Sequence, residues 1–185
     1  MWEASVADGM ARISAEREQY VPGRSLTIEQ VLGLLAETPP RLEALTADLV
    51  PAHLHSAPSD DEWSASDVLA HLRACADVWG RCIQTIITEE RPTLQAVNPR
   101  TWIEQTDYRE LEFQPSLCAF ASQRTALLTI LEQLPPDGWS RAATVTGAGK
   151  ALERTVLFYA QWLAEHERPH VKQIARLVAT IPVVQ

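Results

Sequence analysis

Apolar side chains recur at helical spacing near the C-terminal end of the chain. Their steps of three or four residues follow the helical period of about 3.6 residues, whereas a half-buried strand would alternate at every second residue. We therefore predict one amphipathic helix from about Lys150 to Thr180, with one face packed against other helices. The stripe consists of Leu152, Val156, Tyr159, Leu163, His166, His170, Ile174 and Leu177.

Three earlier segments have the same amphipathic pattern. A helix that begins near Thr27 is predicted to be kinked or broken at Pro39–Pro40, because proline lacks the backbone N–H and clashes with the preceding turn. A second helix is expected to begin at Ser64, where Asp67 completes a Ser-x-x-acid cap. A third is expected to begin at Pro115, since proline suits the first helical turn. Four such segments with little strand signal predict an all-α fold, a four-helix bundle.

The segments outside these helices carry weaker signals. A short helix is expected within Thr101–Asp107, and the extended stretch Thr144–Thr146 is too short to predict a sheet. The first two dozen residues have weak periodicity. We therefore expect an N-terminal extension at residues 1–24, followed by a single bundle domain at residues 25–185.

Charge and composition exclude several classes of function. The net charge is −8 and no run of Lys or Arg occurs, which argues against nucleic acid as a partner. No segment approaches the roughly 20 consecutive apolar residues of a membrane span. Residues 1–23 lack the apolar centre of a signal peptide, so a cytoplasmic location is expected. Three cysteines, an odd number, suit reduced thiols better than a disulfide framework.

Two histidines occupy the apolar stripe of the last helix. His166 and His170 are four residues apart, so their imidazoles project from the same face. A third histidine, His71, lies beside Leu72 on the apolar side of the second helix. If the two helices face each other, the three imidazoles can bind one divalent metal and leave a position for water or substrate. The alternative for each histidine is a core side chain hydrogen-bonded to the backbone.

Two sequence segments resemble signatures of a known family. Residues 62–72, EWSASDVLAHL, resemble the helix-two signature of the DinB/YfiT-like superfamily of bacterial four-helix-bundle metalloproteins. Residues 166–174, HERPHVKQI, resemble its helix-four HxxxH signature. Trp139 and the Pro39–Pro40 pair fit the same pattern, and the resemblance runs from about residue 27 to residue 177.

This resemblance implies a fold, a site and a class of activity. The fold would be an up-down-down-up four-helix bundle, in which His71, His166 and His170 bind a divalent metal, either Zn, Ni, Fe or Mn. Relatives are metal-dependent hydrolases, or transferases and isomerases that use a low-molecular-weight thiol. A small-molecule substrate and a homodimer are implied as well.

Two residues depart from the family pattern. Glu167 stands where many relatives carry Asp, and the helical rotation of about 100 degrees per residue turns it away from His166. We therefore expect Glu167 to support the site from behind a ligand or to face solvent rather than to bind the metal, and we expect both Glu165 and Glu167 to be solvent-facing charges. Pro169 lies between the two helix-four histidines, where proline removes the bond to the Glu165 carbonyl and can kink the axis.

Several neighbours have two interpretations each. Cys75 is either a fourth metal ligand or a small buried side chain. Asp67 either orients an imidazole or caps its helix, and Tyr159 either contacts substrate or packs in the core. His53 and His55 are expected outside the site.

No general base can be assigned from the sequence, so two functions stay open. The chain is either a metal-dependent enzyme or a non-catalytic protein of the same fold that binds a small ligand or a metal. A purely structural module is a third possibility that no sequence feature requires.

Overall fold

The computed structural model describes residues 26–180, so the predicted extension at residues 1–24 lies outside the described residues. No helix within the described range is long and apolar enough to cross a membrane. The elements in chain order are α2 (Ile28–Thr46), α3 (Pro51–His55), α4 (Ala65–Thr88), β1 (Thr93–Gln95), α5 (Pro99–Ile103), α6 (Phe113–Glu132), the 3-10 helix η1 (Pro136–Ser140), β2 (Ala142–Thr146), β3 (Leu152–Thr155) and α7 (Val156–Ala179).

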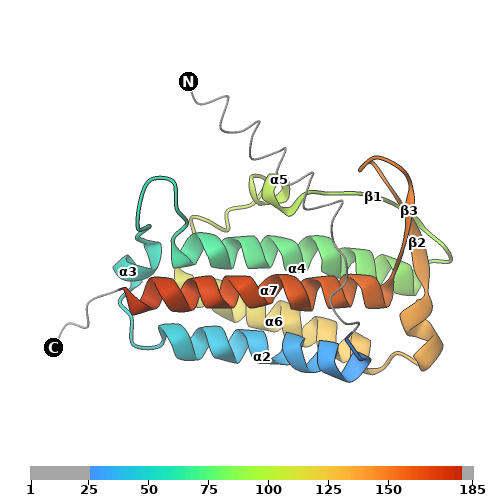
Figure 1. Cartoon of the computed structure of the whole chain (residues 1–185), viewed down its shortest axis with the longest axis horizontal. Coiled ribbons are helices and arrows are strands. Elements are labelled where there is room, and N and C mark those ends of the chain that lie inside the picture. The colour runs from blue at the N-terminus through green and yellow to red at the C-terminus, as the bar shows by residue number, and fades with distance from the viewer. Residues whose placement is uncertain (1–25, 181–185) are drawn as a thin grey trace.

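Helices α2, α4, α6 and α7 form a four-helix bundle (Figure 1). In Figure 1, α4 and α6 run in one direction, while α2 and α7 run in the opposite direction. This is the predicted up-down-down-up arrangement, and the all-α prediction is confirmed. Helix α7 packs mainly against α4 and α2, which brings the predicted metal-binding helices side by side.

The first turn of α4 is set by a reciprocal pair of hydrogen bonds. The Ser64 hydroxyl accepts from the Asp67 amide at 3.1 Å, and the Asp67 carboxylate accepts from the Ser64 amide at 3.1 Å. This capping box satisfies two amides that a helix start leaves unpaired. It fixes where the helix begins, and therefore which face carries His71.

Of the two predicted alternatives, a kink or a break at Pro39–Pro40, the break does not occur. Helix α2 continues through both prolines from Ile28 to Thr46. The side chains of Leu35 and Leu42, on either side of the prolines, are fully buried, so the same face packs throughout. Tertiary burial of this stripe outweighs the loss of two backbone hydrogen bonds.

A small sheet closes one end of the bundle, contrary to the expectation of no sheet. Strand β2 pairs in parallel with β1 and antiparallel with β3. Gly147 and Gly149 in the hairpin turn have φ of 85° and 90°, which glycine adopts without steric cost. The last helix consequently begins at Val156 rather than near Lys150, and Leu152 is exposed on β3.

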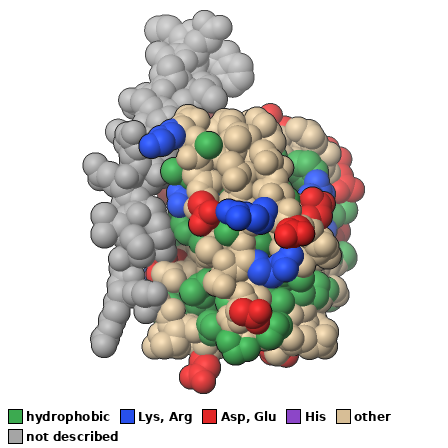
Figure 2. All heavy atoms as spheres, turned by 90° about the vertical axis from the view of Figure 1, so that its right-hand side faces the viewer, with side chains coloured by type: hydrophobic (Ala, Val, Ile, Leu, Met, Phe, Trp, Pro, Cys, Tyr) green, Lys and Arg blue, Asp and Glu red, His purple; other side chains and the backbone are tan. Residues whose placement is uncertain are grey.

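On the face in Figure 2, acidic and basic side chains are interspersed with apolar ones.

The connection between α4 and α6 passes along α4 and carries α5 (Figure 1). Asp77 of α4 holds it in place, because its carboxylate accepts from Trp102 Nε1 at 3.2 Å and from the Tyr108 hydroxyl at 2.6 Å. Gln123 of α6 donates to the same carboxylate. The short helix predicted within Thr101–Asp107 is present, slightly earlier, as α5.

Candidate metal centre

Three imidazoles from two helices meet inside the bundle. His71 projects from α4, and His166 and His170 project from α7. Their ring centroids are 5.2 Å apart for His71 and His166, 5.0 Å for His71 and His170, and 4.8 Å for His166 and His170. The structure therefore brings together the three histidines that the sequence singles out. Pro169 does not prevent this, since α7 is helical through it.

Burial keeps these imidazoles neutral. It lowers the pKa of His71 to about 3, with further lowering from His166 and His170, and it lowers the pKa of His166 to about 3 as well. The pKa of His170 is also lowered, chiefly by burial. A neutral imidazole has a free lone pair on one ring nitrogen, which is the form that binds a metal.

The hydrogen bonds of the site prepare it for a cation. Nε2 of His71 lies 3.0 Å from Nε2 of His166, so the ring nitrogens of two helices are directed at each other. Nδ1 of His170 lies 3.1 Å from Oε1 of Gln173, which only accepts, so Nδ1 carries the proton and Nε2 keeps its lone pair. The role of Gln173 was not predicted from the sequence, although its position three residues after His170, one helical turn along, was the available signal.

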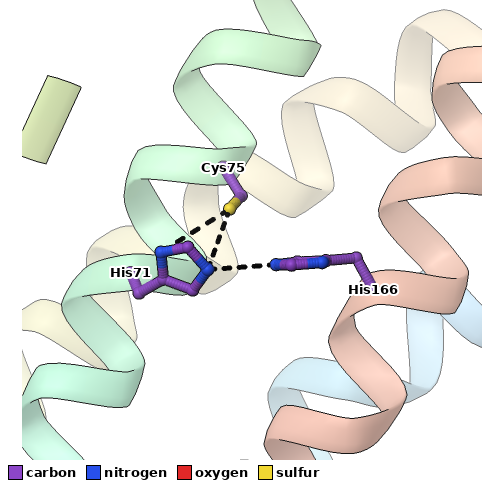
Figure 3. A group of neighbouring side chains, drawn as sticks. All are labelled: His71, Cys75 and His166. Carbon is purple, nitrogen blue, oxygen red and sulfur yellow. Dashed lines mark hydrogen bonds between the residues drawn. The ribbon is translucent and has the colours of Figure 1, made fainter. Parts of the chain in front are cut away.

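Cys75 offers an alternative donor. Its Sγ lies 3.5 Å from Nε2 of His71, and the donor atoms of His71, Cys75 and His166 all lie within 4.8 Å of one another (Figure 3). Burial raises the pKa of the Cys75 thiol, which disfavours the thiolate that binds metals. Cys75 completes a compact donor group with His71 and His166, whereas His170 is placed beside the pair by its ring-centroid distances of 5.0 Å and 4.8 Å.

Aromatic rings surround the imidazoles. Trp63 stacks on His170 with an interplanar angle of 15° and a centroid distance of 6.4 Å, and its centroid is 5.2 Å from His71. Trp79 stands edge-on to His166 at 5.0 Å. These contacts restrict ring rotation, so the nitrogen positions are held by packing.

A pocket of about 450 Å³ adjoins the three histidines, a volume typical of small-molecule sites. Side chains of α4 and α7 line it together with the segment around α5. The lining residues are His71, Trp79, Val97, Asn98, Pro99, Arg100, Trp162, His166, Pro169 and His170.

The prediction that Glu167 faces solvent is wrong. Its side chain is fully buried and accepts a hydrogen bond from the guanidinium of Arg124 on α6. Burial raises the pKa of Glu167, while the neighbouring Arg124 charge opposes part of this rise. The nearby Glu165 is half-buried. Rotation along the helix turns Glu167 toward α6, whereas His166 faces α4.

The remaining candidates lie away from the imidazoles. His53 and His55 are on α3 and do not line the pocket, and His55 lies 4.0 Å from Glu112. Tyr159 is buried in the apolar core. Asp67 forms the helix cap, which is one of the two roles predicted for it.

Comparison with known proteins places this geometry in a family context. A sequence model of the DinB superfamily matches residues 34–174. A protein of Bacillus licheniformis that is provisionally named a metal-dependent hydrolase is 24% identical over 148 residues, which are 78% of this chain and 83% of that protein. The structure of YfiT from Bacillus subtilis, described as a probable metal-dependent hydrolase with an unusual four-helix bundle topology, superimposes with a TM-score of 0.71. That alignment covers 85% of this chain and 91% of YfiT at 20% identity.

Proposed function

The chain belongs to the DinB superfamily, and from this membership and its histidine geometry we propose that it is a metal-dependent hydrolase of a small-molecule substrate. In this proposal His71, His166 and His170 bind one divalent ion. The observation that carries the proposal is the meeting of three neutral imidazoles from α4 and α7 beside a pocket of ligand size.

The donor set fits a divalent metal. Two Nε2 atoms that lie 3.0 Å apart, on rings held neutral by burial, need either a shared proton or a cation between them. Because Nδ1 of His170 contacts Gln173, Nε2 of His170 is available as a third ligand. Imidazole suits Zn, Ni and Fe(II), and Mn is tolerated, so the ligands alone do not select among these metals.

His170 is preferred over Cys75 as the third ligand. The imidazole of His170 is neutral and needs no deprotonation, whereas the buried Cys75 thiol must lose a proton in apolar surroundings. Cys75 also packs within an apolar core cluster. A three-histidine site would be open, as catalytic zinc sites are.

The side chains around the metal would have different roles in the reaction. When bound, a divalent ion supplies Lewis acidity, which activates water or polarises a substrate carbonyl. Trp63 and Trp79 hold the imidazoles in place, and Trp79 and Trp162 form apolar walls of the pocket. No carboxylate lines the pocket among the described residues, so none of these side chains is assigned as a general base.

Elemental analysis of untagged protein tests this proposal. We expect close to one divalent ion per chain, and its loss in the double variant His166→Ala/His170→Ala. The control His53→Ala/His55→Ala removes two histidines outside the pocket and should keep the metal. Wild-type protein that takes up no zinc, nickel, iron or manganese would leave the non-catalytic ligand-binding protein as the better description.

Activity separates hydrolysis from thiol-dependent transfer. We expect metal-loaded protein to hydrolyse a simple ester such as para-nitrophenyl acetate without any thiol. Turnover only in the presence of a low-molecular-weight thiol, with consumption of that thiol, would favour the transferase. The homodimer and the cytoplasmic location stay predictions.

A further inference from the structure

The side chains that line the pocket beside the three imidazoles include one with a permanent formal charge. Of the residues that line the pocket, Arg100 is the single Lys, Arg, Asp or Glu. The pocket is therefore electropositive within a protein whose net charge is −8. This contrast points to an anionic ligand.

The guanidinium of Arg100 lies beside Trp63, a ring that contacts the imidazoles. Its Cζ is 5.4 Å from the ring centroid of Trp63, which in turn lies 5.2 Å from the ring of His71. Within residues 26–180, no carboxylate lies within ion-pair distance of Arg100. Its charge is thus available to a ligand in the pocket.

The surrounding structure holds Arg100 in position. The Asn98 side chain accepts a hydrogen bond from the Arg100 amide at 3.0 Å, which fixes the start of α5. The next turn is tied to α4 through Trp102 and the Asp77 carboxylate. A guanidinium on a tethered segment loses less freedom on binding than one on a free loop.

The walls of the pocket complement an apolar group. Trp79 and Trp162 pack edge-to-face with centroids 5.9 Å apart, and Val97 and Pro99 add apolar surface. A ligand that fills this space thus needs an apolar body and one anionic end. A single guanidinium balances a monoanion, and its forked donors match the two oxygens of a carboxylate.

We propose that the substrate is a small organic carboxylate, whose carboxylate binds Arg100 and whose apolar body packs on Trp79 and Trp162. Arg100 is then the residue that determines specificity. This inference rests on the proposed function, since it names the substrate class of the same pocket. It does not depend on which metal the histidines bind.

Binding of a matched pair of probes to metal-free protein tests the inference. The probes are para-toluate and para-toluamide, which share their shape and differ in charge. Metal is removed by chelation and dialysis, because a carboxylate that bound a metal directly would imitate the Arg100 contact. Affinities are measured by isothermal titration calorimetry for the wild type, Arg100→Gln and Arg109→Gln. Arg109 is the matched control, since it is a nearby cation that does not line the pocket.

We expect wild-type protein to bind toluate more tightly than toluamide. Arg100→Gln should weaken toluate binding about tenfold and leave toluamide within about twofold, as loss of one charge-assisted contact predicts. Arg109→Gln should leave both affinities within about twofold. Equal affinities for the two probes, no toluate binding at millimolar concentration, or an equal loss in both arginine variants would overturn the inference. None of these outcomes depends on how much metal the protein binds. The carboxylate inference can therefore fail while the proposed metal site holds, and the metal site can fail while the carboxylate inference holds.

Discussion

The guanidinium of Arg124 donates a hydrogen bond to the carboxylate of Glu167 in the interior of the bundle, where the two side chains are 2% and 0% exposed. This contact joins α6 to α7 at the residue that follows His166. Nε and Nη1 of Arg124 and Oε2 of Glu167 have no further hydrogen-bond partner among residues 26–180. A buried pair with unsatisfied atoms adds little net stability, but removing one partner leaves a buried charge unbalanced.

Substitution of one partner of this pair should destabilise the fold strongly. We expect Arg124→Met to lower the free energy of unfolding by about 3–5 kcal/mol, because Glu167 is left charged or must take up a proton. The double variant Arg124→Met/Glu167→Leu should be more stable than Arg124→Met. Urea unfolding measures both, with the exposed Arg168→Met as control. A double variant less stable than the single one would show that the pair is itself strongly stabilising.

The Gln173 contact should control metal affinity without supplying a ligand. Gln173→Leu removes the acceptor that keeps the proton on Nδ1 of His170, and we expect metal affinity to fall by about tenfold. Gln173→Glu keeps an acceptor at this position and should retain affinity. Competition with a chromogenic chelator measures both constants. If the Leu and Glu variants lost affinity equally, the contact would have no role in fixing the tautomer.

The buried histidines should make the metal-free protein sensitive to acid. The pKa of His71 and of His166 falls from 6.5 to about 3 on folding, so the unfolded chain binds more protons between these values. The stability that they contribute is complete above about pH 6.5 and is lost as the pH falls toward 3, by up to about 1.4 kcal/mol per group and pH unit.

A variant that lacks one of these histidines tests the predicted direction of the change in stability with pH. His71→Gln should show a shallower decline of unfolding free energy than wild type between about pH 7 and pH 5, a range above most carboxylate titrations. Chemical denaturation at several pH values gives both slopes. A steeper or unchanged slope in the variant would mean that His71 titrates normally in the folded protein.

The Asp77 carboxylate should determine how rigidly α5 is held. Asp77→Ala removes the acceptor shared by Trp102, Tyr108 and Gln123, so we expect faster amide exchange over residues 99–108. Exchange in the centre of α4 should change little. The exposed Glu104→Gln serves as control on the same segment. Unaltered exchange in Asp77→Ala would assign the rigidity of the connection to packing alone.

The helices were predictable because each one buries a single apolar stripe. His71, His166 and His170 occupy positions on two such stripes, so their inward direction followed from spacing alone. Their contact required in addition that α4 and α7 be neighbours, which came from the resemblance to a family and not from periodicity.

The burial of Glu167, the small sheet and the continuity of α2 were not predicted, because each depends on contacts between segments that are distant in the sequence. Glu167 carries a charge that spacing alone assigns to solvent, and only Arg124 on another helix explains its burial. The sheet consists of three strands of three to five residues, too short for an alternating pattern to emerge. Pro39–Pro40 breaks an isolated helix but not one whose flanking leucines are fully buried.

X-ray absorption spectroscopy of the zinc-loaded protein tests the central claim most directly. Zinc–sulfur and zinc–nitrogen distances differ, at about 2.3 Å and about 2.0–2.1 Å. We predict three imidazole nitrogens and no sulfur around the zinc, with a spectrum unchanged in Cys75→Ser and a lower nitrogen count in His170→Ala. A sulfur at the longer distance in wild type that is absent in Cys75→Ser would contradict the account and assign the site to His71, Cys75 and His166.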